Sequence, residues 1–213
     1  MLMSDRPVLG DASPAARLTT IAATFASITL VVLHVFQLRD AGLGLVHVWL
    51  VPVAWIAADL FSGLVHWSAD TWGSESTPVL GSRFIRPFRV HHINPSDITT
   101  RPFFDLNGDV ALGVLPILAI AFATPPSLRF FLVALAVSVL PTNQIHQWAH
   151  RETVPRPVRA LQRWGIILRP EQHQLHHTEP FRSHYCITSG WWNGLLGRTR
   201  ILKRLEDRRP RRA

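Results

Sequence analysis

Four long apolar stretches constrain this chain more than any other feature of its sequence. They cover residues 17–38, 45–66, 110–124 with its flanks, and 128–145. The first is about 22 residues long, enough for a helix to cross a hydrocarbon layer of about 30 Å at 1.5 Å per residue. Most charged residues lie outside these stretches, although the chain has a formal net charge of +8. The sequence therefore predicts an all-α polytopic membrane protein with about four transmembrane helices.

The remaining segments predict one domain with two short tails. Residues 1–14 are rich in Pro, Gly and Ser and are expected to form a flexible N-terminal tail. Residues 15–207 are expected to form the integral-membrane domain, and residues 208–213 a basic C-terminal tail. The first apolar stretch lacks a small-residue cleavage site and is too long for a signal peptide, so we expect a retained span.

Histidines supply the second constraint, because the chain has 11 of them and a single cysteine. A cysteine-rich zinc or iron–sulfur site is therefore excluded. Eight histidines occur in groups with metal-ligand spacing, namely His66, His91, His92, His146, His150, His173, His176 and His177. His173, His176 and His177 are spaced to project from one side of a helix toward a common point.

Eight ligands exceed the three or four protein ligands of one zinc ion, so two metal ions are the economical interpretation. Imidazole-rich sites with open positions suit iron that binds O2, which indicates C–H oxidation. The sequence has no His-Glu-x-x-His motif, which disfavours a metalloprotease. The adjacent His91 and His92 point about 100° apart on a helix and are expected to serve different ions.

Two aspartates in the second apolar stretch and its extension have open roles. Asp70 follows His66 by one helical turn and is a metal ligand, a hydrogen-bond partner of a ligand, or a helix cap. Asp59 is costly in lipid and is expected to face the interior of the bundle. It pairs there either with a cation or a histidine, or in a buried hydrogen bond between helices.

The order of spans and histidines predicts one face for the whole site. The third and fourth spans form a hairpin between the two histidine regions, so both regions emerge on the same side. Of the 22 Lys and Arg residues, only Arg39 and Arg129 fall in the far-side turns. The positive-inside rule makes the histidine side cytoplasmic, and we expect a bacterial inner membrane. Tryptophans such as Trp67 and Trp191 are interpreted as interfacial anchors, and the arginines as partners of lipid headgroups rather than of nucleic acid.

Several motifs, taken in order, resemble the Kua/CarF lipid desaturase family. They are Ser62-Gly63-Leu64-Val65-His66-Trp67, Ala69-Asp70-Thr71-Trp72-Gly73, Phe84-Ile85-Arg86-Pro87-Phe88-Arg89 with the His91-His92 pair, Thr142-Asn143-Gln144-Ile145-His146, Trp148-Ala149-His150, and Tyr185-Cys186-Ile187-Thr188-Ser189-Gly190-Trp191. The resemblance covers roughly residues 49–207. Val90 and Gln172 depart from the family pattern, but the eight histidines are all present.

The resemblance implies a plasmanylethanolamine desaturase that converts an alkyl ether phospholipid into a plasmalogen vinyl ether. It implies a diiron centre, O2 as co-substrate, the eight histidines as ligands with Asp70 beside them, and a separate electron donor of cytochrome b5, ferredoxin or similar type. Arg86, Arg89 and Arg101 are candidates to bind the lipid phosphate, or serve only to set the topology. His184 is a candidate for the substrate channel. The alternatives are an acyl-chain desaturase, a lipid hydroxylase, a zinc-binding membrane scaffold without turnover, and a b-type haem electron carrier.

Overall fold

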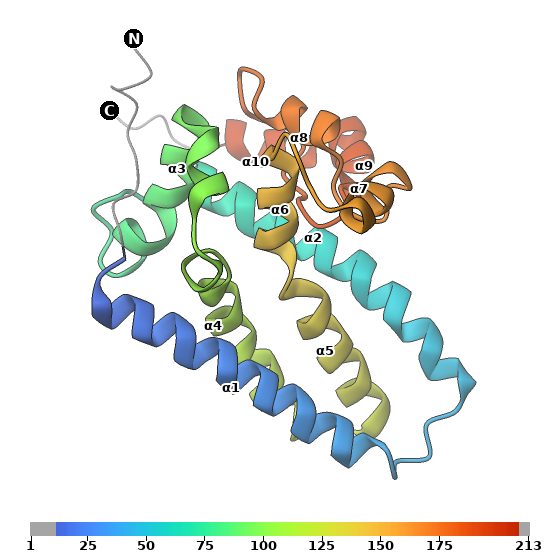
Figure 1. The fold of residues 1–213 in the computed structure, drawn as a ribbon. Helices are drawn as coiled ribbons and strands as arrows, with labels where there is room; N and C mark the ends of the chain where they lie inside the picture. The colour runs from blue at the N-terminus through green and yellow to red at the C-terminus, as the bar shows by residue number, and fades with distance from the viewer. Residues whose placement is uncertain (1–11, 209–213) are drawn as a thin grey trace.

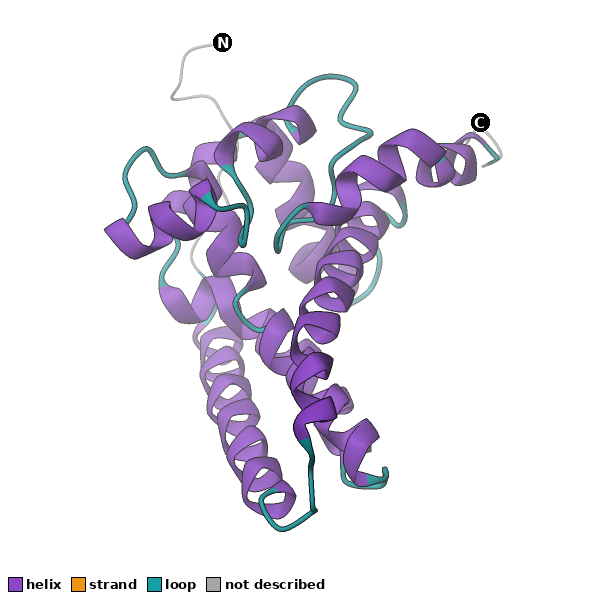
Figure 2. Ribbon diagram, turned by 90° about the vertical axis from the view of Figure 1, so that its right-hand side faces the viewer, coloured by secondary structure: helices purple, strands orange, loops and turns teal. Residues whose placement is uncertain are grey.

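A computed structural model describes residues 12–208, and all regular structure in that range is helical (Figure 1, Figure 2). The expected tails therefore lie almost wholly outside the described residues. The long helices are α1 (Pro14–Leu38), α2 (Leu50–Thr71), α4 (Phe103–Ala121) and α5 (Pro126–Val139). The shorter elements are η2 (Leu45–Trp49), η3 (Gly81–Ile85), α3 (Arg86–Ile93), η4 (Pro95–Thr100), α6 (Thr142–His150), α7 (Arg156–Arg163), α8 (Pro170–His176), α9 (Trp191–Thr199) and α10 (Ile201–Asp207).

Within the described residues, four segments are long and apolar enough to cross a membrane. They are Pro14–Leu38, His47–Thr71, Phe103–Ala121 and Pro126–His150. The predicted number of spans is therefore confirmed, and the protein is an integral membrane protein. The boundaries differ most in the third span, which begins at Phe103 and takes polar residues of the preceding segment into its first turns.

Prolines determine where the fourth span begins and where it breaks. Pro126 occupies the first position of α5, where its missing N–H costs nothing. α5 ends at Val139, and Pro141 follows directly before α6. Because proline has no N–H to bond the preceding turn, the span is divided into two helices. α6 thereby starts a separate element that carries two of the predicted metal ligands.

The long helices pack as two pairs, with α1 along α4 and α2 along α5. Small residues and branched apolar residues fill the space between them, namely Ala58, Val114, Leu118, Ala121, Val133, Ala136 and Val139. Large apolar side chains on the outside of the bundle are exposed, for example Phe25 and Phe36 of α1, each 59% exposed. An outward apolar surface with a small-residue interior is typical of helices surrounded by lipid.

Figure 1 shows the short helices α3 and α7 to α10 gathered at one end of this bundle, where they form a cap. Asp59 of α2 joins the bundle to the cap. Its Oδ1 accepts hydrogen bonds from the backbone N–H groups of Ser189 at 2.7 Å and Gly190 at 2.8 Å, and its Oδ2 from Trp192 at 3.1 Å.

The prediction that Asp59 faces the interior is confirmed, since its side chain is fully buried. Its partner is neither a cation nor a histidine, so the alternative of a buried hydrogen bond between helices holds. The three N–H groups lie at the start of α9, where the partial positive charge of a helix favours an anion.

The tryptophans do not all act as interfacial anchors. Trp67 is only 4% exposed, and its Nε1 donates to Glu206 of α10 at 2.9 Å. Its interpretation as an anchor was wrong, because α10 folds back over the end of α2 and covers the indole. Trp191 is 51% exposed and retains the expected position at the surface.

Candidate metal centre

Four helices bring the predicted ligands together at the cap end of the bundle. They are the last turns of α2, then α3, α6 and α8. The histidines of the two regions therefore lie on one side, as the order of the spans predicted. Among the described residues they form two groups that could each hold a metal ion. The five-histidine group comprises His91, His146, His150, His173 and His177, and the aspartate group comprises His66, Asp70, His92 and His176.

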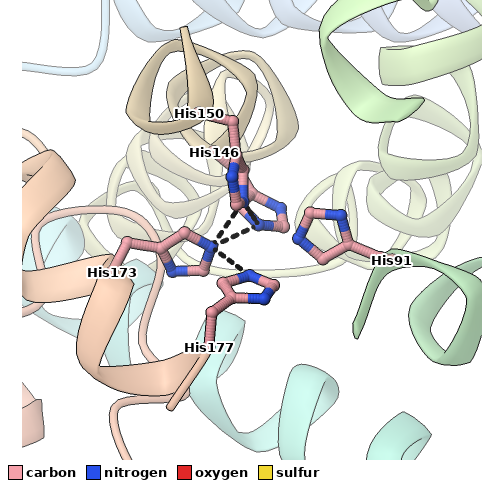
Figure 3. Close-up of side chains that lie close together, drawn as sticks. All are labelled: His91, His146, His150, His173 and His177. Atoms are coloured by element: carbon pink, nitrogen blue, oxygen red, sulfur yellow. Dashed lines mark hydrogen bonds between the residues drawn. The ribbon is translucent and has the colours of Figure 1, made fainter. Parts of the chain in front are cut away.

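The five-histidine group is built around the Nε2 atom of His173 (Figure 3). This atom lies 2.8 Å from Nε2 of His146, 2.8 Å from Nε2 of His150 and 3.1 Å from Nε2 of His177. The ring of His91 completes the group, with its centroid 4.5 Å from that of His150 and 4.7 Å from that of His177.

Hydrogen bonds alone do not explain this convergence. A neutral imidazole nitrogen carries one proton or one lone pair, so Nε2 of His173 is unable to satisfy three ring nitrogens at once. Two nitrogens bound to one metal ion at about 2.1 Å and at right angles are separated by about 3 Å. The observed separations match that spacing, which indicates a site for a metal ion.

The aspartate group converges on the carboxylate of Asp70. Its Oδ2 lies 3.1 Å from Nε2 of His92, 3.4 Å from Nε2 of His66 and 3.6 Å from Nε2 of His176. Trp72, not Asp70, forms the C-cap of α2, so the interpretation of Asp70 as a helix cap finds no support here. The carboxylate instead lies where a metal ligand would lie.

Backbone carbonyls orient two of these rings. Nδ1 of His66 lies 3.1 Å from the carbonyl oxygen of Tyr185, and Nδ1 of His176 lies 2.7 Å from that of Ser183. A carbonyl only accepts, so each Nδ1 carries the proton and donates it. Each Nε2 is then left with a lone pair directed at Asp70, which is the tautomer that binds a metal.

Unpartnered buried atoms supply an independent test of the fit to metal. Within the described residues, Nε2 of His66, Nε2 of His176 and both carboxylate oxygens of Asp70 are buried without a hydrogen-bond partner, as are both ring nitrogens of His91 and of His92. Buried polar atoms without partners cost about 1–3 kcal/mol each. A bound metal ion would remove that cost, so the residues fit such ions.

The expectation that His173, His176 and His177 project toward a common point was wrong. His173, His176 and His177 do not point at one ion, because His173 and His177 belong to the five-histidine group and His176 to the aspartate group. Residues three and four positions on from His173 diverge by about 100° around the helix. α8 also ends at His176, and His177 forms its C-cap. One short helix thus contributes to both groups, as α3 does through His91 and His92.

The three arginines suggested for substrate binding contact different groups of the protein. Arg101 pairs with Asp97 at 2.7 Å, and Arg89 donates to the carbonyl of Gly73 at 2.9 Å. Arg86 lies 3.9 Å from Glu75, and 46% of its side chain is exposed. His184 bonds Ser183 through Nδ1 at 2.9 Å and belongs to neither metal-ligand group.

Sequence reasoning missed the residues whose backbone carbonyls orient the histidine rings. Tyr185 and Ser183 act through main-chain carbonyls, which every residue has, so no residue type signals them. The Tyr185 ring also lies against the aspartate group, 5.2 Å from the ring of His176, and its hydroxyl donates to Glu206 at 3.1 Å. Only the folded chain brings α10 to this position.

Burial and neighbouring histidines keep the ligand rings neutral. They lower the pKa of His176 and of His177 to about 3, with burial as the larger cause. Burial likewise holds the pKa of His91 and of His173 well below the ordinary value of about 6.5. Neutral imidazole is the form that binds metal.

These pKa shifts predict acid sensitivity of the metal-free protein. Below pH 6.5 the unfolded chain takes up protons on these histidines, whereas in the folded chain His176 and His177 do so only near pH 3. Stability is therefore fully present above pH 6.5 and is lost as the pH falls toward 3, by up to about 1.4 kcal/mol per pH unit for each histidine. Thermal unfolding of the metal-depleted protein in detergent at pH 8 to 4 measures this slope.

The variant His176→Gln is the control, because it removes one histidine whose pKa is about 6.5 in the unfolded chain and about 3 in the folded chain. We expect its stability to fall less steeply between pH 6.5 and 4. An unfolding temperature that is independent of pH in that range for the original chain would contradict the assignment of neutral buried rings.

The fold and this site together define a helical integral-membrane protein with two adjacent histidine-rich groups, each of which could hold a metal ion, at one end of the bundle. Comparison with known proteins identifies the class further. The model of the lipid desaturase domain matches residues 55–208. The chain belongs to this lipid desaturase family of oxidoreductases, as its motifs predicted.

Three curated relatives show how similar the chain is to other members. It is 42% identical over 191 residues to the plasmanylethanolamine desaturase of Myxococcus xanthus, covering 85% of this chain and 67% of the relative. It is 43% identical over 164 residues to plasmanylethanolamine desaturase 1 of Mus musculus, covering 71% and 60%. It is 39% identical over 158 residues to the chloroplastic fatty acid desaturase 4 of Arabidopsis thaliana, covering 71% and 48%.

The chain thus spans between about half and two thirds of the length of these relatives. All three matches include most of the domain that carries the two metal-ligand groups. No solved structure matches the chain.

Proposed function

We propose that the chain is a membrane desaturase that converts the sn-1 alkyl ether chain of plasmanylethanolamine into the vinyl ether of a plasmalogen. The observation that carries the proposal is the pair of adjacent ligand groups, eight histidines and one aspartate, in a chain of this family. The names of the Myxococcus xanthus and Mus musculus relatives support the choice of substrate.

The reaction removes one hydrogen atom from each of the first two carbons of the alkyl chain and forms a double bond between them. O2 accepts these two hydrogens together with two electrons and two protons, and two water molecules result. The two electrons come from a separate one-electron carrier protein, of cytochrome b5, ferredoxin or similar type. Two bound iron ions would supply the activation of O2 that this chemistry needs.

The residues of the chain would hold, orient and shield these ions. The five-histidine group offers only neutral nitrogen ligands, whereas the aspartate group adds the negative charge of Asp70. Unequal charge would make the two positions electronically different. His66 and His176 are fully buried, which would shield an ion held by these ligands from bulk water.

Placement of the substrate follows from the position of the centre. The reacting carbons of an ether phospholipid lie next to its headgroup, and the ligand groups lie where the spans meet the cap. Arg86, the most exposed of the three arginines suggested above, is the best placed to bind a phosphate, with Arg89, Arg101 and His184 as further candidates. The excess of Lys and Arg on this side supports a cytoplasmic location, at a bacterial inner membrane.

Acyl-chain desaturation is a second candidate, because fatty acid desaturase 4 of Arabidopsis thaliana is 39% identical to the chain. The same two ligand groups would serve that reaction. The difference lies in which carbons reach the centre, and therefore in how deeply the lipid chain enters. An acyl double bond is stable to acid, whereas a vinyl ether is cleaved by acid, so the products are distinguishable.

Expression in a host that lacks plasmalogens, supplied with an alkyl ether lipid and a competent donor, tests the proposal. Mass spectrometry of ethanolamine phospholipids is expected to show an acid-labile product lighter by two hydrogens. His176→Ala is expected to abolish it, and Gln174→Ala, which changes an exposed residue of the same helix, is expected to retain it.

Three other results would contradict the proposal. A product with an additional oxygen would indicate a hydroxylase, and an acid-stable double bond would indicate an acyl-chain desaturase. Purified protein with one zinc ion, no iron and no product would indicate a scaffold without turnover.

A further inference from the structure

A hollow in the cap lies outside both metal-ligand groups. Its volume is about 410 Å³, and its walls are formed by α7, α8 and α9 with the segments that lead from α7 to α8 and into α9. Arg163, Arg169, Gln172, Ser189, Trp164 and Trp191 are among the residues that line it. Such a volume accommodates a headgroup-sized ligand.

The charge of the hollow is positive and uncompensated. Arg163 and Arg169 are both exposed, and neither guanidinium makes an ion pair or hydrogen bond with any residue between 12 and 208. Arg89 and Arg101, by contrast, already bond other groups of the protein. Two free guanidinium groups at one hollow favour an anion with several oxygens, because each group presents a planar fork of N–H donors.

A buried hydroxyl in the wall adds a second, independent indication of a polar ligand. Ser189 is 2% exposed, and its Oγ has no hydrogen-bond partner among the described residues. The backbone around it is held rigidly, because its N–H bonds Asp59 and the Gln172 side chain donates to the carbonyl of Gly190 at 2.7 Å. A ligand oxygen in the hollow would satisfy the hydroxyl.

Exposed tryptophans line the hollow and an exposed isoleucine lies near it, which indicates that the hollow lies next to lipid. Trp164 is 71% exposed and Trp191 51% exposed, and Nε1 of Trp191 donates to the carbonyl of Gly165 at 2.6 Å. Nearby, Trp55 of α2 donates to the carbonyl of Ile166, and Ile166 is itself 40% exposed. Exposed indoles beside apolar neighbours are typical of a membrane–water interface.

We propose that this hollow binds the phosphate group of a membrane phospholipid, with Arg163 and Arg169 on the phosphate oxygens and Trp164 and Trp191 beside the glycerol and first methylenes. The ligand chemistry is a phosphate oxyanion, which a lipid headgroup and free phosphate share. The tryptophans favour the lipid. This assignment does not depend on the reaction proposed above.

Native mass spectrometry of the full chain in neutral detergent, titrated with a short-chain phosphatidylethanolamine, tests the site. We expect Arg163→Gln/Arg169→Gln to weaken binding of the first lipid at least about tenfold, since two charge-assisted contacts are lost. The control Arg198→Gln/Arg204→Gln removes two exposed arginines from α9 and α10 and is expected to bind like the original chain. Ser189→Ala is expected to weaken binding by a smaller factor.

Two further binding measurements distinguish a lipid phosphate from free phosphate. Inorganic phosphate at a concentration equal to the lipid is expected to displace little of it, and displacement with equal affinity would assign the site to soluble phosphate. A diacylglycerol without phosphate is expected not to bind. Equal lipid binding by all variants, or diacylglycerol binding as tight as phospholipid binding, would overturn the proposal.

Discussion

Asp59→Ala is expected to destabilise the protein by about 3–5 kcal/mol, which is a large part of the total stability of an ordinary domain. The substitution leaves the buried N–H groups of Ser189, Gly190 and Trp192 without an acceptor. Each such group costs about 1–3 kcal/mol. The contact also attaches the cap to α2, so its loss is expected to release the chain that leads into α9.

Fluorescence-detected size-exclusion chromatography after heating measures the loss. Asp59→Asn is expected to cost less, because its amide oxygen still accepts some of these hydrogen bonds. Asp40→Ala serves as the matched control, because the ion pair of Asp40 with Arg39 is exposed and contributes little to stability. Equal unfolding temperatures for Asp59→Ala and Asp40→Ala would show that the buried carboxylate does not hold the cap.

His173→Ala is expected to remove about one metal ion per chain and to lower desaturase activity by at least about 100-fold. The reason is geometric, since Nε2 of His173 lies within 3.1 Å of three other ring nitrogens. Loss of residues that merely orient ligands already costs about 10–100-fold. Elemental analysis of purified protein, together with product yield, measures both effects.

The ions are expected to be lost separately. His173→Ala empties the position in the five-histidine group, whereas His66→Ala is expected to weaken the aspartate group and to spare the first ion in part. Gln174→Ala is the control for substitution on α8. Full metal content and full activity in His173→Ala would refute the assignment of the five-histidine group.

The spans and the ligand inventory were predictable because each depends on local sequence. A helix of about 20 apolar residues satisfies its own backbone and is stable in lipid wherever it occurs in the chain. Because the third and fourth spans form a hairpin between the two histidine regions, His66 and His146 are placed on the same side without further information. The i, i+4 spacing of His66 with Asp70, and of His146 with His150, is likewise local to one helix.

The pairing of ligands across helices was not predictable in the same way. Helical periodicity separates His176 from its neighbours by angle, but it does not say which other helix each ring faces. The sequence left three possible roles open for Asp70 and two possible kinds of interaction open for Asp59. Their surroundings come from α3, α8 and the start of α9, which are distant in sequence and adjacent only after folding.

The sequence by itself determined that this protein spans a membrane with four helices and carries its eight candidate ligand histidines on one side. Those properties follow from hydrophobic length, charge distribution and residue count. Only the tertiary structure decided that the ligands divide into two groups and that main-chain carbonyls of Ser183 and Tyr185 set two ring tautomers. It also decided that the two arginines beside Ser189 have no partner among residues 12–208. Such features depend on contacts between remote segments, which no local pattern encodes.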